Sequence, residues 1–348
     1  MPSSPTNTAP PSPAPSGDEV SAAASSSPVG AGITSPMGEH HELRATLGGR
    51  SQRVVVTEVA ASLRELQVDG IELIQDYPTD AQPPWCSGWV LVPWPNRVAG
   101  GAWTYDGVVQ QLEITEPELG NALHGLLTRA PYRVSARTTD SITLAVGISP
   151  QAGYPFELAT SVRYQLVEDG LLVTHRIENT GSHAAPVAIG AHPFLRLGTV
   201  PTEELTLYIN ADTHIEVDER LNPSGITTDV EGTKNDFRTG QLVGRVDLDD
   251  AWSGVRREAD GRSVHYLEAP DGSQVQMFMD ASFGYIQAFT TTEFATTGGM
   301  VTAVAVEPMT APADAFNSGE GLRWLEPGDV WEASWGIRHR HPGGSRLA

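Results

Sequence analysis

The chain has 348 residues, with 22 Lys and Arg against 43 Asp and Glu, and a formal net charge of −21 at pH 7. This acidity disfavours nucleic acid or an anionic membrane as the main partner and suits a neutral small molecule, although a solubilising acidic surface explains it equally. The length permits two average domains or one large all-β domain.

Cys86 is the one cysteine of the chain, which excludes an intrachain disulfide and a zinc site built from cysteines. The chain starts without the basic residues and apolar stretch of a signal peptide, and a run of about eighteen apolar residues occurs nowhere. We therefore expect a soluble, cytoplasmic protein that has no contact with a membrane.

Residues 1–38 consist mainly of Ser, Pro, Ala, Gly and Thr, with almost no large apolar side chains. Such a segment buries too little apolar surface to offset the entropy lost on ordering. We expect a disordered low-complexity tail over 1–38 and a single domain over 39–348. An inert extension is the plainer interpretation of the tail, and a docking segment is the alternative.

Short runs of β-branched and aromatic residues follow from about residue 52, separated by Asp-Gly dipeptides at 69–70, 106–107, 169–170 and 271–272. Asp-Gly supplies the positive φ angles that a tight hairpin turn requires. A 3.6-residue apolar period is lacking, and 35 Gly and 26 Pro would interrupt helices. Apolar and polar residues also alternate on both sides of the turn at 326–329. The sequence predicts an all-β fold, a large antiparallel β-sandwich.

Two polar clusters in the first half of the chain are candidates for binding. Asn96 and Arg97 follow the segment Pro93-Trp94-Pro95, and a rigid turn of this kind can hold a guanidinium at the edge of a cleft. His124 lies among apolar residues, with Gly125 beside it. Taken alone, these residues fit a surface arginine and a packed core histidine better than a binding site.

Two further clusters are candidates for catalysis. His192 ends an apolar strand directly before Pro193, so strand pairing must stop and the imidazole is presented at the strand end. Glu307 ends another apolar run, where desolvation would raise its pKa towards that of a useful base. An ion-paired structural glutamate is the alternative. Asp249 and Asp250 form either an acidic binding edge or a solvated turn.

The chain resembles the aldose 1-epimerase (galactose mutarotase) family, because six segments occur in family order between residue 93 and about residue 310: PWPNRVAGGAWTYDG, NALHG, GAHPFLRLG, VDERLNPSGITTDVEGTKNDFR, LDDAWSG and VAVEP. The resemblance implies the family's large antiparallel supersandwich and interconversion of the α and β anomers of a free aldohexose, without a cofactor or a metal. It also implies site residues: Glu307 as general base, His192 as general acid, and Arg97, His124, Asp249 and Asn96 holding the sugar.

Opening a pyranose removes the proton of the C1 hydroxyl while the ring oxygen is protonated, so an acid and a base must flank one carbon atom. In the expected starting state, His192 is protonated and Glu307 is ionised. Two departures from the family leave details open. Asp249 is followed by Asp250 where family members have His, so either could bind sugar, although alignment to Trp252 favours Asp249. Pro193 stands where galactose mutarotases often have Tyr-Phe-Asn, which leaves the substrate open.

Two rival functions are a hexose-6-phosphate 1-epimerase and a noncatalytic carbohydrate-binding protein on the same fold. A phosphate site needs several converging cations, and Arg97 and Arg196 alone lie near the four clusters, so a free sugar is preferred. Trp94, Trp252 and Phe316 are candidate surfaces for sugar stacking, with core packing as the alternative. We expect a sugar as the partner and a monomer or weak homodimer as the oligomeric state.

Overall fold

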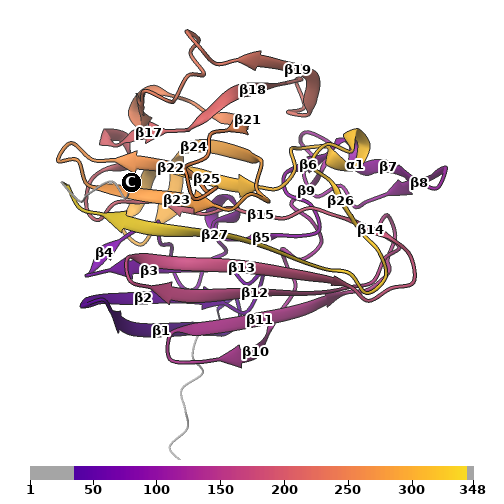
Figure 1. Cartoon of the computed structure of the whole chain (residues 1–348), viewed down its shortest axis with the longest axis horizontal. Coiled ribbons are helices and arrows are strands. Elements are labelled where there is room, and N and C mark those ends of the chain that lie inside the picture. Colours follow the sequence, from indigo (N-terminus) through magenta and orange to yellow (C-terminus); the bar gives the residue numbers. More distant parts are fainter. Residues whose placement is uncertain (1–34, 343–348) are drawn as a thin grey trace, which may run out of the picture. The chain divides into compact units, whose positions relative to one another are not determined.

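The computed structural model describes residues 35–342, and the regular secondary structure of these residues is almost entirely β-strand (Figure 1). The short helical elements in this range are α1 (Ala315–Ser318) and the 3-10 turns η1 (Pro84–Cys86), η2 (Ala99–Gly101), η3 (Thr202–Glu204) and η4 (Val243–Arg245). The predicted all-β class is therefore confirmed.

Most of the expected tail, residues 1–34, lies outside the described residues, as do residues 343–348. The last residues assigned to that tail are described. The backbone N–H of Gly38 donates to the carbonyl of Ser35 at 3.1 Å, and the side chain of Met37 is 1% exposed. The folded domain therefore includes residues a few positions before the boundary expected at residue 39.

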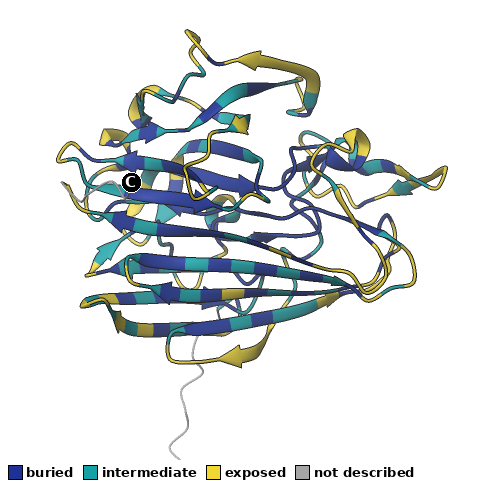
Figure 2. Ribbon diagram, in the orientation of Figure 1, coloured by how far each residue is buried: buried dark blue, intermediate teal, exposed yellow. Residues whose placement is uncertain are grey.

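The largest sheet is antiparallel and has nine strands in the order β10 (Arg133–Arg137), β11 (Ser141–Ile148), β12 (Leu158–Val167), β13 (Gly170–Asn179), β27 (Val330–Arg340), β23 (Gln274–Met279), β22 (Ser263–Glu268), β17 (Thr206–Tyr208) and β20 (Gln241–Leu242). Buried residues alternate with partly exposed ones along β12 and β13, as a half-buried sheet requires (Figure 2). Hairpins join β12 to β13 and β22 to β23 at these dipeptides, as predicted. The expected positive φ angles are not found at 169–170, where Gly170 already pairs with Val167 and the turn is formed by residues 168–169. At 271–272, φ is positive at Gly272 but not at Asp271.

A second antiparallel sheet contains β19 (Pro223–Asp229), β18 (Ala211–Val217), β21 (Asp249–Val255), β24 (Tyr285–Thr296), β25 (Gly299–Met309), β15 (Gly190–Ala191) and β5 (Val90–Leu91), and β16 (Phe194–Leu195) pairs with β25 as its eighth strand. Strands β24 and β25 form its centre through a long hairpin. Most of the predicted site residues lie on this sheet or directly beside it.

The remaining strands form a four-stranded sheet and three short two-stranded pairs. The sheet contains β1 (His40–Leu47), β2 (Arg50–Thr57), β3 (Leu63–Val68) and β4 (Ile71–Glu72), and the pairs are β14 (Ala185–Val187) with β26 (Arg323–Leu325), β6 (Arg97–Val98) with β9 (Ala122–Leu123), and β7 (Ala102–Tyr105) with β8 (Val108–Gln111). The turns at 69–70 and 106–107 have positive φ at both residues, as Asp-Gly predicts.

One hydrophobic core cluster extends from Leu43 to Ile337 and receives side chains from all three large sheets. Strands β1, β2 and β3 contact β12 and β13, so the four-stranded sheet packs on the nine-stranded one. Each fully buried aliphatic side chain in such a core stabilises the fold by roughly 1.5–3 kcal/mol relative to its exposed state. This core holds the second sheet, and with it the site, in a fixed geometry.

Gly125 fixes the chain beside the site, and its replacement gives a test of this packing. Its φ is +84°, and a Cβ built there would lie 2.2 Å from the backbone oxygen of Val92. At Gly49, φ is +81° and no atom lies within 4 Å of such a Cβ. We expect Gly49→Ala to cost about 1–2 kcal/mol for the left-handed backbone, and Gly125→Ala to cost a further ~1–3 kcal/mol for the clash.

The free energy of unfolding of both variants would be measured by urea denaturation. Equal losses at the two positions would show that the backbone at Gly125 can move away from Val92 without cost.

Candidate active site

Glu307 lies on β25, and His192 lies opposite it between β15 and β16, the two short strands that pair with β25. Gly190 of β15 pairs with Met309, and Phe194 of β16 pairs with Ala305, so the interruption at His192-Pro193 falls opposite Glu307. The His192 imidazole Nε2 lies 3.4 Å from Glu307 Oε1. Because the register is the same on both sides of the interruption, the imidazole and the carboxylate lie side by side on one face of the sheet.

Burial determines the electrostatics of this pair, because the Glu307 and His192 residues are 2% and 6% exposed. Burial raises the pKa of Glu307 well above its ordinary value; the charge of Asp249 adds to this rise, and that of Arg97 opposes it. Burial lowers the pKa of His192 to about 4. Glu307 Oε2 and His192 Nδ1 have no hydrogen-bond partner among residues 35–342. Without sugar, the pair therefore favours a protonated carboxyl beside a neutral imidazole.

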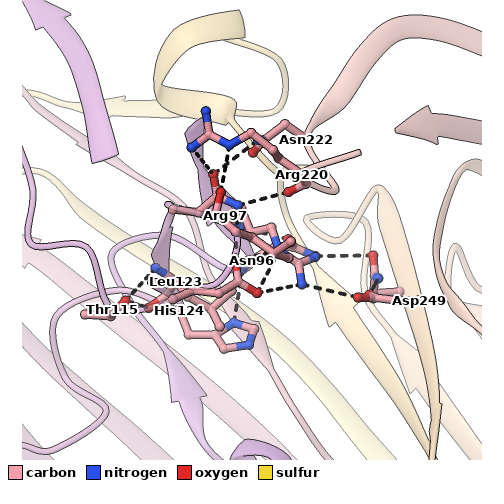
Figure 3. Close-up of polar contacts among 12 residues, drawn as sticks. Asn96, Arg97, Thr115, Leu123, His124, Arg220, Asn222 and Asp249 are labelled. Carbon is pink, nitrogen blue, oxygen red and sulfur yellow. Dashed lines mark hydrogen bonds and ion pairs between the residues drawn. The ribbon is translucent and has the colours of Figure 1, made fainter. Parts of the chain in front are cut away.

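Arg97 is held between two carboxylates next to this pair. Its Nε donates to Glu116 Oε2 at 2.9 Å, and its terminal nitrogen donates to Glu116 Oε1 at 2.9 Å and to Asp249 Oδ2 at 3.2 Å (Figure 3). Although burial opposes its charge, these hydrogen bonds keep the pKa of Arg97 above its ordinary value. The positive charge is thus fixed in direction and already compensated.

Gln287 joins Asp249 and Asn96 into one network. It lies on β24 directly across from Glu307 in the β24–β25 register. Its Nε2 donates to Asp249 Oδ1 at 2.6 Å, and its Oε1 accepts from Asn96 Nδ2 at 3.3 Å. Asn96 has a φ of +56°, and its Oδ1 accepts the backbone N–H of Arg97 at 2.8 Å. Asn96 is thus directed towards Gln287 of β24, and Arg97 towards Asp249 of β21.

His124 has a defined protonation pattern. Its Nδ1 lies 3.2 Å from the backbone N–H of Asn96, which can act only as a donor, so Nδ1 is the acceptor. Its ring lies 5.3 Å from that of His192 and nearly perpendicular to it, at 88°. Burial lowers the pKa of His124, and the charges of His192 and Arg97 lower it further. A neutral His124 then carries its proton on Nε2, where it can donate to a ligand.

The two neighbouring aspartates of β21 have different surroundings. Asp249 receives hydrogen bonds from Arg97 and Gln287. Asp250, on the opposite face of the strand because side chains alternate, lies 2.7 Å from His214 Nε2 through its Oδ1. Asp249, and not Asp250, therefore belongs to the polar network beside Glu307.

A small cleft adjoins this network. Its polar side consists of Asn96, Arg97, Asp249 and Gln287, and its apolar side of Ile215, Val217, Leu221, Pro223, Ala251, Pro312 and Ala313. Arg220 stabilises the turn that contains Leu221, because its Nε donates a hydrogen bond to the carbonyl of Leu119 at 2.7 Å (Figure 3). The buried Glu307 and His192 do not line this cleft, which reaches them only through Gln287 and Asn96.

A larger concavity lies elsewhere, lined by Arg196, Gln75, Thr202, Thr302 and neighbouring residues. It contains none of the predicted site residues, and Arg196 there is paired with Glu72 and Asp76. Unlike the smaller cleft, it has none of Asn96, Arg97, Asp249 and Gln287 in its lining.

The aromatic residues considered for stacking are part of the core. Trp94, Trp252 and Phe316 are 2%, 1% and 7% exposed, and Trp94 packs against Phe316 with ring centroids 5.3 Å apart.

Two residues of the site, Glu116 and Gln287, were not predicted from the sequence. Gln287 carried a usable signal, because it is a polar residue within an apolar strand, as Glu307 is.

Within residues 35–342, no group of three or more His, Cys, Asp or Glu side chains is arranged to hold a metal ion. In the same range, no helix has the length and apolar character needed to cross a membrane.

Known proteins of similar structure have the same fold. An aldose epimerase homologue from C. elegans matches with a TM-score of 0.74 at 18% identity, over 87% of this chain and 99% of that one. A galactose mutarotase-like protein from Clostridium acetobutylicum matches with a TM-score of 0.75 at 18% identity, over 87% and 96%. These matches confirm the predicted galactose mutarotase-like sandwich.

Similar sequences extend this result. The uncharacterised protein YihR of Escherichia coli (strain K12) is 31% identical over 284 residues, covering 81% of this chain and 89% of that protein. Human galactose mutarotase is 33% identical over 159 residues, covering 43% of this chain and 44% of that protein. The family model described as aldose 1-epimerase matches residues 44–338. The chain therefore belongs to the aldose 1-epimerase family.

Proposed function

We propose that this protein is a mutarotase that interconverts the α and β anomers of a free aldohexose, with Glu307 as base and His192 as acid. The observation that carries the proposal is the 3.4 Å separation of His192 Nε2 and Glu307 Oε1 in a nearly solvent-free setting. The two oxygens of a hemiacetal are bonded to the same carbon, so the groups that exchange protons with them must both come within hydrogen-bond reach of that one centre.

The proposed reaction uses two proton transfers. Glu307 takes the proton of the C1 hydroxyl while His192 gives a proton to the ring oxygen, the C1–ring oxygen bond breaks, and the C1 carbonyl forms. Rotation about C1–C2 presents the other carbonyl face, and the reverse transfers close the ring. The pair begins and ends with one proton in total, so an external acid or base is not consumed.

Before the ring can open, sugar binding must move this proton from Glu307 to His192. Without sugar, burial favours the proton on Glu307 and a neutral His192. We propose that sugar hydroxyls donate to Glu307 and stabilise its carboxylate, so that the proton moves to His192. The unpartnered Glu307 Oε2 can accept such a bond. Because the cleft does not open directly onto the pair, Gln287 and the Leu221 turn must shift as the sugar enters.

The charges favour a free sugar over its phosphate. Arg97 is the one cation among the described residues that line the cleft, and it is paired with Glu116 and Asp249. A phosphate group would meet these carboxylates without an available cation. Neutral hydroxyls can instead use Asp249 as an acceptor, and Arg97, Asn96 and His124 as donors.

The first test removes the base. We expect Glu307→Gln to lower kcat by roughly a hundred- to ten-thousandfold, because the amide cannot accept the hydroxyl proton. Equilibrium sugar binding should persist, since the side chain keeps its shape. Relaxation of optical rotation after dissolving a pure anomer measures the rate, and Glu326→Gln at a distant turn is the control. Near-normal relaxation by Glu307→Gln would reject the assignment.

The second test compares the two aspartates of β21. Asp249→Asn should raise KM by about ten- to hundredfold, the effect of losing a charged hydrogen-bond acceptor worth roughly 1.5–3 kcal/mol. Asp250→Asn should leave KM nearly unchanged, because Asp250 faces His214. A larger rise in KM for Asp250→Asn would reverse the assignment of the sugar ligand.

The third test is the pH dependence of kcat/KM, after subtraction of the spontaneous rate. Below about pH 4, His192 takes a second proton, the pair then lacks a base, and the rate should fall as pH decreases. As pH rises through the elevated pKa of Glu307, the pair loses its one proton and the rate should fall again. An acid limb near 6.5, the ordinary pKa of histidine, would contradict a buried His192.

A further inference from the structure

Trp85 is a partly exposed aromatic residue in the segment between β4 and β5. Its ring lies against that of Phe289, with centroids 5.4 Å apart and planes inclined at 47°. Its indole N–H donates to the carbonyl of Glu293 at 3.3 Å. Trp85 nevertheless keeps 45% of its surface exposed. The ring is thus packed against the protein on one side and exposed to solvent on the other.

This ring lies on the face of the second sheet that carries the site. Phe289 of β24 pairs with Asp249 on one side and with Ala305 on the other, and directly paired residues have their side chains on the same face. Phe289 is two residues from Gln287, which corresponds to about 7 Å along the strand. The centroid of the Phe194 ring lies 6.2 Å from that of Phe289 and 5.4 Å from that of His192, so Phe194 packs between these two rings. Trp85 and Phe289 therefore continue the site face beyond the acid–base pair.

The backbone connects this segment to His192 directly. The N–H of Gly88 donates to the His192 carbonyl at 2.8 Å, and the N–H of His192 donates to the Trp89 carbonyl at 3.1 Å. Trp85 and Cys86 have φ angles of +51° and +61°, which are unfavourable for residues with side chains. Backbone strain of this kind is concentrated at ligand sites, where the fold holds a side chain in a required position.

We propose that Trp85 and Phe289 form an apolar wall of the sugar site, and that Trp85 determines which hexoses are accepted. This inference rests on the proposed mutarotase function. A pyranose has a ring of polar hydroxyls around a face of C–H groups, and an aromatic ring packs against that face. Hexoses that differ in the orientation of one hydroxyl present different C–H faces, so the wall discriminates among them.

The test compares Trp85→Ala with Trp324→Ala. Trp324 is also 45% exposed, and it stacks on Tyr105 at 6.0 Å, outside the site network. Trp85→Ala should raise KM by about three- to tenfold for the preferred hexose. It should change kcat by less than about twofold, because the acid–base pair is intact. Trp324→Ala should match the parent protein in both constants.

Trp85→Phe is the rescue variant, because it keeps a ring against Phe289 and loses the bond to Glu293. It should restore most of the affinity and of the preference among glucose, galactose and mannose. Thermal unfolding of each variant separates a loss of fold from a loss of binding. Equilibrium binding of the same sugars by calorimetry tests the wall independently of turnover.

Unchanged KM, binding and sugar preference in Trp85→Ala would overturn the wall while leaving the mutarotase intact. Absence of mutarotation by the parent protein would reject the proposed function instead. In that case, equal binding of the hexoses by the parent protein and Trp85→Ala, or no binding by either, would also overturn the wall.

Discussion

The contact between His192 and Glu307 across β25 is the interaction on which the rest of the site depends. β15 and β16 pair with β25 in one register, Gly190 with Met309 and Phe194 with Ala305, so His192 falls directly opposite Glu307. Directly opposed residues of an antiparallel pair have their side chains on the same face and close together. The register therefore brings the imidazole to the carboxylate. Burial by the surrounding sandwich then destabilises the charged form of both groups, which favours the proton on Glu307 in the absence of sugar.

Around this pair, one cation is shared by two carboxylates. Arg97 is shared by Glu116 and Asp249, Asp249 is shared by Arg97 and Gln287, and Gln287 reaches Asn96. Such a network orients donors and acceptors without leaving a net positive charge for an anionic ligand. This arrangement agrees with the overall charge of −21 and with a neutral substrate.

The sequence predicted the local structure well where the signal was local. Asp69-Gly70 and Asp106-Gly107 require positive φ at both residues, and they form the expected turns. Asn96, Arg97, His124, His192, Asp249 and Glu307 were expected near a common site, and the fold brings them together, although their roles remain predictions. Alignment to Trp252 favoured Asp249 over Asp250 but left both open, because the choice depends on which side chain of β21 faces Gln287 and Arg97.

The aromatic residues show the same limit. Trp94 and Trp252 lie in or beside the recognisable motifs, yet tertiary packing buries them. Trp85 lies outside the motifs used for the family resemblance. Its position depends on a left-handed turn and on a contact with Phe289, and neither could be predicted from the local sequence. Glu116 was missed for a similar reason, since its role depends on the distant Arg97 guanidinium reaching it.

Magnetisation exchange between the α and β anomeric protons, followed by NMR with catalytic amounts of the protein, tests the central claim most directly. The sugars would be glucose and galactose, each compared with its 6-phosphate. The account predicts accelerated exchange for at least one free hexose and little or none for the phosphates. Acceleration confined to the phosphates, or exchange at the spontaneous rate for every sugar, would contradict it.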